Sequence, residues 1–317
     1  MAQVKAVKPT DIFSKEEWAV LTAGSRWRGL WLVAHAWLTI LLTIGIAVWF
    51  DHPIAWVIAV FLIGGRQLGL AILMHDAAHG HISPDRKLNN FVGEYFCAAP
   101  VGTDLQAYRA YHLKRHAYTQ QPEDPDLSLS APFPTTSASM FRKVARDLTG
   151  ITFFKQRSAQ IKMALEGMKP NAKEQQVFIG RATIRFILFQ LGLLALSLIS
   201  GFGILPFALW FVALATSFQL ALRIRNIAEH ACTETEGDDP FSHARTTIAC
   251  MTERALVAPY WVNYHLEHHL FMGVPCWNLE RTHRALINKG YGPRMMVAEG
   301  YGEVLSEVTQ RETAAPA

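Results

Sequence analysis

Four apolar segments, arranged as two close pairs, constrain the fold of this chain more than any other feature of its sequence. They span approximately residues 30–50, 54–74, 186–203 and 204–222. Each is close to the length of about 20 residues that an α-helix needs to cross a bilayer. Short polar or glycine-containing turns, at residues 51–53 and 201–203, mark the middle of each pair. The sequence therefore predicts an all-α integral membrane protein with four transmembrane helices that form two hairpins.

The composition argues against several other classes of protein. Hydrophobic residues make up 50% of the 317 residues and charged residues 18%, whereas a soluble domain usually carries about 25% charged residues. This balance excludes a disordered chain and disfavours a soluble enzyme with two buried hairpins. The formal net charge of +4 is too small to indicate a nucleic-acid partner. The four cysteines form no CxxC pair, so the sequence signals neither a zinc ribbon nor a redox dithiol.

The distribution of lysine and arginine predicts the orientation of the chain in the membrane. These residues are absent from both hairpin tips and frequent near the N-terminus, in the loop 75–183 and in residues 223–317. Because positively charged loops stay on the cytoplasmic side, we expect both termini and the long loop in the cytoplasm, below a membrane of the bacterial inner-membrane type. The polar N-terminus does not look like a cleaved signal peptide. We expect the chain after about Gly302 to be frayed.

Two segments of the long loop have the character of membrane-associated helices. Residues 91–101 are apolar but too short to cross a bilayer, so we expect them to lie in the interface or to dip into the membrane. Residues 153–169 combine bulky apolar side chains with lysine and arginine. This pattern predicts an amphipathic helix, either on an anionic membrane surface or on a solvated cap.

Eight of the thirteen histidines occur in clusters. They are His75, His79, His112, His116, His230, His265, His268 and His269. Within a cluster the spacing is mostly three or four residues, which places side chains on one face of a helix. The predicted topology brings all the clusters to the same side of the membrane, so that eight imidazoles converge at one depth. The isolated histidines, His35, His52, His243 and His283, are interpreted as surface or satisfied core residues.

The chemistry of imidazole indicates what such a group would bind. Neutral imidazole is a good ligand for iron, zinc, copper and nickel. Eight imidazoles are too many for one tetrahedral zinc ion, but they suit two ions that keep open positions. Two redox-active irons can share the electrons needed to reduce dioxygen, and the oxidant formed can attack an unactivated C–H bond.

These motifs resemble the membrane fatty acid desaturase superfamily, which also contains lipid hydroxylases and carotenoid ketolases. The resemblance covers about residues 30–285. It is carried by the histidine boxes at 75–79 (HDAAH), 112–116 (HLKRH) and 265–269 (HLEHH), and by the sequence TQQPEDPD at 119–126.

The resemblance implies both a fold and an activity. The fold is a bundle of four transmembrane helices with a cytosolic helical cap that carries a di-iron site, so the whole chain, 1–317, is interpreted as one desaturase-like domain. The activity is oxygen-dependent desaturation of a fatty acyl chain or lipid. The resemblance also implies that Asn226, one helical turn before His230, completes the surroundings of the second metal ion.

The second box departs from the pattern of the superfamily, which is HxxHH. Arg115 stands where the middle histidine is expected. Arginine stays protonated and cannot bind a metal ion, and its charge repels a dication. Four outcomes follow: Arg115 turns outward and water takes the position; His81 or another residue substitutes; only one ion binds well; or the site does not work.

Several polar residues beside the boxes are candidates to hold the metal ligands in orientation, because metal-bound histidines usually donate their second N–H to a carboxylate or carbonyl. The candidates are Asn226, Asp76, Glu229, Glu267, Asp124 and Asp126. The alternative for the acids is a solvated surface position. Arg66 lies inside the second span, where a charge is costly. We favour its pairing with a neighbouring helix over a contact with a substrate carboxylate.

Electrons for this reaction must come from another protein. The sequence has no GxGxxG in a strand–helix context, no cysteine cluster and no haem-binding motif of the HPGG type. A basic cytoplasmic face would instead dock an acidic ferredoxin or a small cytochrome. Hydroxylation or ketolation of a lipid or carotenoid is the nearest alternative activity. A non-catalytic metal transporter or sensor and a degenerate, inactive member of the superfamily are the remaining alternatives.

Overall fold

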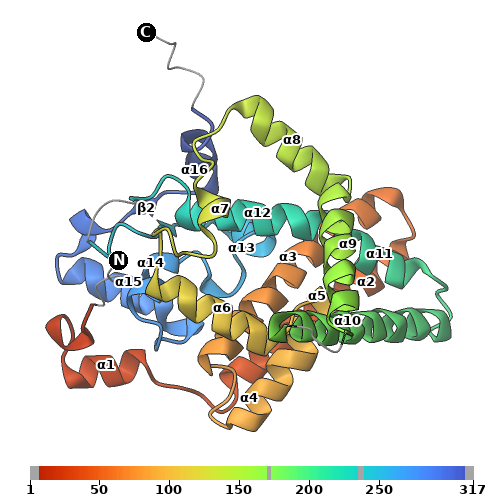
Figure 1. Ribbon diagram of the computed structural model, residues 1–317, viewed down its shortest axis with the longest axis horizontal. Coiled ribbons are helices and arrows are strands. Elements are labelled where there is room, and N and C mark those ends of the chain that lie inside the picture. Colours follow the sequence, from red (N-terminus) through yellow and green to blue (C-terminus); the bar gives the residue numbers. More distant parts are fainter. Residues whose placement is uncertain (1–6, 170–172, 235–238, 311–317) are drawn as a thin grey trace. The chain divides into compact units, whose positions relative to one another are not determined.

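The computed structural model describes residues 7–169, 173–234 and 239–310. Within these residues the regular secondary structure is almost entirely helical (Figure 1). Two strands of two residues each, β1 (Thr246–Thr247) and β2 (Val297–Ala298), pair in parallel. The structure thus confirms the predicted all-α fold.

Contacts within the chain divide it into two compact units. The span unit comprises Ser25–Arg109 and Val144–Leu222, and the C-terminal unit comprises Met1–Gly24, Ala110–Lys143 and Arg223–Ala317. Three of the divisions fall inside helices: α6 (Leu105–Ala117), α8 (Ser137–Leu148) and α12 (Ser217–His230).

Among the described residues, four helical segments are long and apolar enough to cross a membrane, as predicted. They are α2 (Arg28–Phe50), α3 (Pro53–His79), α10 (Glu174–Ile199), and α11 (Leu205–Ala215) followed by α12. The turn between α2 and α3 is capped by His52, whose Nδ1 accepts a hydrogen bond from Ile54 N at 3.2 Å, and Pro53 takes the first helical position, where it needs no amide donor.

The helix boundaries differ from the predicted ones because a helix does not end where its apolar stretch ends. The second predicted span stops at Met74, yet α3 continues through His79 and ends only at Gly80, which adopts φ 87°. Glycine reaches this left-handed conformation without strain and so ends the helix. Likewise α10 starts well before Phe186, in a polar stretch that favours helix.

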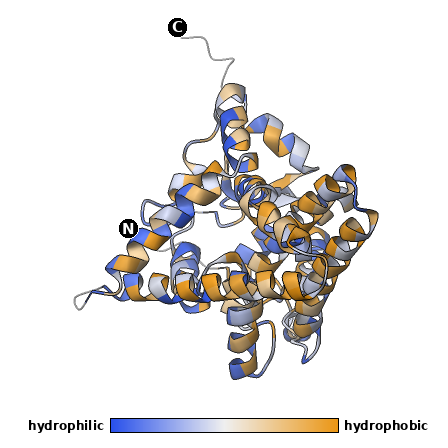
Figure 2. Cartoon of the chain, turned by 90° about the vertical axis from the view of Figure 1, so that its right-hand side faces the viewer, coloured by the Kyte–Doolittle hydropathy of each residue, from blue (hydrophilic) through white to orange (hydrophobic). Residues whose placement is uncertain are grey.

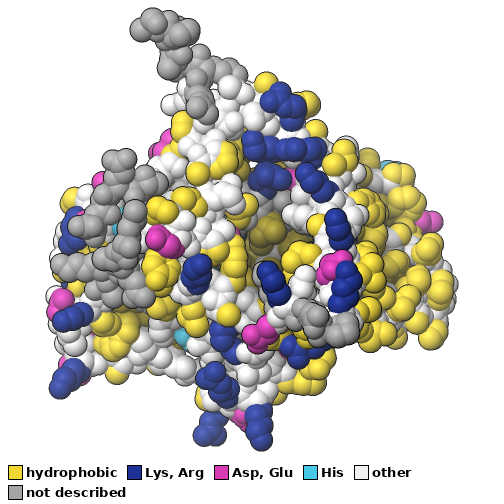
Figure 3. Space-filling model, in the orientation of Figure 1, with side chains coloured by type: hydrophobic (Ala, Val, Ile, Leu, Met, Phe, Trp, Pro, Cys, Tyr) yellow, Lys and Arg dark blue, Asp and Glu magenta, His cyan; other side chains and the backbone are white. Residues whose placement is uncertain are grey.

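The outer surface of the span unit is apolar. Trp49 is 85% exposed and Ile199 82% exposed, and hydrophobic side chains cover the region of α2, α10 and α11 at the right of Figure 3. The helices that face the viewer in Figure 2 are likewise mostly hydrophobic. Such a surface is compatible with lipid and costly in water.

Close packing of α3 against the start of α12 depends on Gly64. A Cβ atom at this position would lie 2.8 Å from the backbone nitrogen of Phe218 and 2.9 Å from the carbonyl carbon of Ser217. The Ser217 hydroxyl in turn donates a hydrogen bond to the Val60 carbonyl oxygen at 2.6 Å. The two backbones therefore meet with no room for a side chain.

We predict that Gly64→Ala destabilises the protein by about 1–3 kcal/mol, the usual cost of forcing extra atoms into a packed interface. Gly45→Ala in α2 is the matched control, because no atom lies within 4 Å of its added Cβ. Thermal unfolding in detergent measures both. Equal melting temperatures for the two variants would contradict this packing.

The segment 91–101 belongs to a continuous helical run. The run consists of α4 (Arg86–Val92), a π-helix (Gly93–Ala98) and α5 (Ala99–Val101). It is tied to α3 by Asn89, whose Nδ2 donates to the Ala77 carbonyl oxygen at 2.9 Å. Phe91, Tyr95 and Phe96 are exposed.

The remaining helices are short. They are α1 (Lys15–Leu21), α7 (Leu127–Ser130), α8 (Ser137–Leu148), α9 (Ile151–Glu166), α13 (Met251–Leu256), α14 (His265–Leu270), α15 (Leu279–Asn288) and α16 (Tyr301–Glu307). The expectation of a frayed chain after Gly302 is wrong up to residue 310. Helix α16 buries Tyr301 and Val304, and Val308 follows it into the core. Residues 311–317 lie outside the described part.

Candidate metal centre

Three helices carry the clustered histidines of the C-terminal unit. His112 and His116 lie one turn apart on α6, His230 ends α12, and α14 carries the third box. Asp104 starts α6 by accepting hydrogen bonds from the Gln106 and Ala107 amides, both at 2.9 Å. Such a cap satisfies backbone N–H groups that have no partner in the first turn of a helix. It also sets the residue at which α6 begins, and so the position of His112 along this helix.

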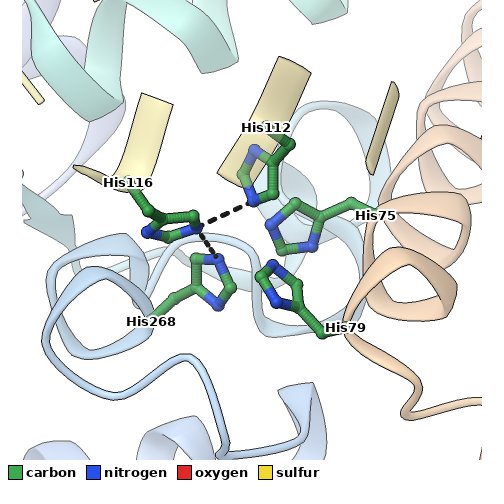
Figure 4. A group of neighbouring side chains, drawn as sticks. All are labelled: His75, His79, His112, His116 and His268. Atoms are coloured by element: carbon green, nitrogen blue, oxygen red, sulfur yellow. Dashed lines mark hydrogen bonds between the residues drawn. The ribbon is translucent and has the colours of Figure 1, made fainter. Parts of the chain in front are cut away.

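The side chains of His112, His116 and His268 converge on one point (Figure 4). His116 Nε2 lies 2.8 Å from His112 Nε2 and 3.0 Å from His268 Nε2. A neutral imidazole has one N–H, so hydrogen bonds alone do not satisfy three nitrogens that meet in this way. Two nitrogens bound to one ion at right angles, each at about 2.1 Å, would lie about 3 Å apart. The donor set fits a metal ion.

His75 and His79 form a pair in the span unit, on the last turn of α3. Their ring centroids are 4.9 Å apart, and both appear in Figure 4. Asp76 Oδ1 lies 3.3 Å from His75 Nδ1, so this predicted orienting residue does contact a histidine. The ring of His81 stacks on that of His79, with 5.9 Å between centroids.

His230, His265 and His269 form another cluster, with ligand nitrogens within 4.8 Å of one another. His230 Nε2 lies 2.9 Å from His265 Nε2. His230 donates its Nδ1 proton to the carbonyl oxygen of His243 at 3.1 Å, because a carbonyl only accepts. The Nε2 of His230 therefore keeps its lone pair, as a metal ligand requires.

The other two members of this cluster are held in a similar way. His265 Nδ1 faces Glu229 Oε1 at 3.3 Å, and His269 Nδ1 lies 3.2 Å from the Thr119 hydroxyl. Burial lowers the pKa of His265 well below its usual value, and neighbouring His269 and His230 lower it further. The imidazole is thus neutral, which is the metal-binding form.

Arg115 does not turn outward to solvent, so that expected alternative is wrong. Its side chain is buried, with the residue only 5% exposed. Arg115 Nη1 lies 2.9 Å from Asp126 Oδ2, and Nη2 lies 3.9 Å from Glu229 Oε2. Glu229 also pairs with Arg225, one helical turn earlier on α12. A buried guanidinium costs too much free energy to be left without acidic partners, which explains its direction.

Glu267 is buried but is directed away from the box that contains it. It is 0% exposed, its Oε1 lies 2.6 Å from His283 Nδ1, and its Oε2 accepts a hydrogen bond from the Thr246 hydroxyl at 2.5 Å. It therefore fastens α14 to α15 and β1. His283 is the satisfied core histidine that its isolation in the sequence indicated.

We predict that Glu267→Gln costs about 1.5–3 kcal/mol of stability, because it removes the charge from a buried hydrogen bond. Glu280→Gln is the control: its ion pair with Arg284, one turn away on α15, is largely exposed, and such pairs contribute about 0–1 kcal/mol. Thermal unfolding of the two variants in detergent compares them. An equal loss in both would rule out Glu267 as a fastening residue.

The remaining predicted residues have identifiable surroundings. Asp124 accepts hydrogen bonds from the Gln120 amide at 2.9 Å and the Asp126 amide at 2.8 Å, and burial raises its pKa. It shapes the loop after α6. Asn226 Oδ1 accepts from Arg225 Nη1 at 3.1 Å. Arg66 is half-buried in α3, close enough to His35 of α2 for the two to interact electrostatically.

The sequence analysis did not identify the residues that position the clustered histidines through hydrogen bonds between loops. Gln120 Nε2 donates to the His230 carbonyl oxygen and to the Thr233 hydroxyl, both at 2.6 Å. The sequence TQQPEDPD contains both Thr119 and Gln120, but it shows no regular spacing of residue types from which their hydrogen-bond partners could be predicted.

Comparisons with known proteins agree with this geometry. A family model described as fatty acid desaturase matches residues 51–297. The chain is also 29% identical over 243 residues to a dihydrorhizobitoxine desaturase of Bradyrhizobium elkanii, a match that covers 74% of this chain and 68% of that relative. The region that the family model matches, residues 51–297, contains every clustered histidine. The chain therefore belongs to the fatty acid desaturase family.

Proposed function

We propose that this oxidoreductase uses dioxygen to desaturate a fatty acyl chain or lipid, at two iron ions held by the histidine clusters. The observation that carries the proposal is the convergence of imidazole nitrogens from α6, α12 and α14. Both the description of the family and the name of the relative specify desaturation. They favour the loss of two hydrogens over hydroxylation or ketolation.

The proposed ligands form two groups. His112, His116 and His268 are assigned to one ion, and His230, His265 and His269 to the other. His75 and His79, on α3 of the span unit, are the remaining proposed ligands, and contacts within that unit fix their position. Arg109 on α6 donates to the Ala78 and Ala77 carbonyl oxygens at the end of α3, at 2.8 and 3.0 Å. The Tyr108 ring lies 6.4 Å from that of His75, and His112 follows Tyr108 by one turn.

Iron bound here would pass electrons from an external donor to dioxygen and supply the reactivity that breaks C–H bonds. The chain itself orients the ligands. The His243 carbonyl oxygen accepts a hydrogen bond from His230 Nδ1, and the Glu229 carboxylate faces His265 Nδ1, so the Nε2 atoms of both histidines are directed to a metal ion. Burial of His112, His265 and His268 keeps bulk water from the ligands.

The placement of the histidines at the ends of spans supports a substrate that lies in the membrane. His75 and His79 are on the last turn of α3, and His230 ends α12. An alkyl chain in the bilayer would approach such a site along the apolar helices. The distribution of lysine and arginine supports an integral inner-membrane protein with its termini and active site in the cytoplasm.

Mass spectrometry of total lipids tests the proposed function. The protein and its His268→Ala variant would be expressed in a bacterial host, and their membranes would be supplied with Fe(II), dioxygen and a reduced ferredoxin. Product that has lost two hydrogens, present only with the unsubstituted chain, is expected. Product that has gained oxygen would assign hydroxylation instead. Dihydrorhizobitoxine should be included among the substrates, because the relative is named for it.

We predict that turnover depends on ionic strength, because an acidic electron carrier would dock on exposed basic residues. Examples of such residues are Lys87, Lys114 and Arg142, and lysine and arginine are prominent on the surface in Figure 3. Raising the salt from about 0.05 M to about 0.5 M should lower kcat/KM for the carrier several-fold. A small uncharged reductant is the control. Equal salt dependence for both donors would contradict electrostatic docking.

A further inference from the structure

We propose that the two metal sites differ in affinity: the cluster of His230, His265 and His269 holds its ion more weakly, and Arg115 positions its ligands instead of serving as one. This inference rests on the proposed metal centre. It concerns residues particular to this chain, since the resemblance to desaturases implies a histidine at position 115.

The number of ligands is the first argument. The weaker cluster contains three imidazoles, and the further histidine that the resemblance implies at position 115 is an arginine. Arg115 adds no lone pair, because its guanidinium is always protonated. Its guanidinium is buried and paired with Asp126.

Arg115 is connected to two of the three ligands through one residue each. Its Nη2 lies 3.9 Å from Glu229, whose other oxygen faces His265 Nδ1 at 3.3 Å. Its carbonyl oxygen accepts the Thr119 hydroxyl proton at 2.9 Å. Thr119 has only that proton to give. Its oxygen therefore accepts from His269 Nδ1 at 3.2 Å, and Nε2 of His269 keeps its lone pair.

Two cationic side chains lie beside the cluster. Arg115 and Arg225 both contact Glu229, which precedes His230 and faces His265. A dication bound beside two guanidinium groups is repelled, whereas the ion-free cluster keeps its buried ion pairs. The ion should therefore leave this cluster without unfolding the protein.

Iron retention by the purified full-length protein tests the inference. Protein loaded with Fe(II) without oxygen would be dialysed against increasing concentrations of a chelator, and the iron per chain measured. We expect two classes of iron, with the weaker class lost at a chelator concentration about 10–100-fold lower, the usual effect of losing a metal-supporting interaction. Circular dichroism should show an unchanged helix content after this loss.

Four variants assign the two classes. His230→Ala should remove the weaker class alone, and His116→Ala should remove the tighter class. Arg115→His should raise the chelator concentration at which the weaker class is lost, closer to the concentration that removes the tighter class. Lys114→His adds the same side chain at an exposed neighbouring position and should change neither.

The possible failures are distinguishable. Two irons retained equally by the unsubstituted protein would overturn the inference and leave the proposed function standing. Loss of the tighter class in His230→Ala, or an unchanged weaker class in Arg115→His, would also overturn it. If Arg115→His does not fold, the loss of the weaker class alone in His230→Ala still decides whether the inference holds. A protein that retains no iron at all would overturn both the inference and the proposed function.

Discussion

Replacing His268 by alanine is expected to lower the rate of desaturation by at least about 100-fold. Loss of a residue that merely orients a metal ligand typically costs about 10–100-fold, and His268 is itself assigned as a ligand. Its Nε2 lies 3.0 Å from that of His116, and no neighbouring side chain takes its place in the group. Quantified lipid product per unit of membrane protein measures the effect.

His52→Ala is the matched control for this substitution. His52 caps α3 at the tip of the first hairpin, where it is exposed and remote in sequence from every histidine box. Loss of such a cap costs about 1 kcal/mol of stability but should leave the rate within about twofold of the unsubstituted protein. If His268→Ala were as active as His52→Ala, the assignment of His268 as a ligand would be wrong.

Glu229→Gln is expected to destabilise the protein by about 3–5 kcal/mol, the cost of breaking a buried ion pair from one side. Glu229 faces Arg115, Arg225 and His265. The substitution leaves two buried guanidinium groups with one carboxylate fewer. It also removes the negative charge that faces His265 Nδ1 at 3.3 Å.

Thermal unfolding in detergent, with iron content measured in parallel, checks this second prediction. Glu166→Gln is the control, because Glu166 and Lys169 form an exposed pair at 2.5 Å that contributes little to stability. A melting temperature of Glu229→Gln equal to that of the control would show that the network of buried charges is unimportant for the fold.

The membrane helices were predictable because their signal is local. Length and hydropathy alone identify a helix that must satisfy its backbone hydrogen bonds inside a bilayer. The ends of these helices were less predictable. The last turn of α3 is polar, yet it stays helical as far as Gly80 because its carbonyl groups still find amide partners.

The histidine groups were partly predictable for the same reason. The spacing of His112 and His116 places both on one face of α6, and the structure brings them to His268 as expected. The assignment of the eight histidines as ligands remains a proposal. The residues that orient them could not be predicted, since the His243 carbonyl and the Thr119 hydroxyl act through contacts between segments distant in the sequence.

Arg115 shows most clearly where sequence reasoning stops. The sequence identified it as an exception that cannot bind metal, and an outward position was one of four outcomes that it left open. Its burial depends on Asp126, in the loop after α6, and on Glu229 on α12. A side chain's partners across the fold, and not its local pattern, decide whether a charge is tolerated inside a protein.

X-ray absorption at the iron K-edge of the purified, iron-loaded protein tests the central claim most directly. We predict a shell of imidazole nitrogens at about 2.1 Å, similar to other nitrogen-bound divalent metals, which is diminished when His116 and His268 are both replaced by alanine. Iron bound only through oxygen, or a spectrum unchanged by that double substitution, would contradict the assignment of the histidine clusters as the metal centre.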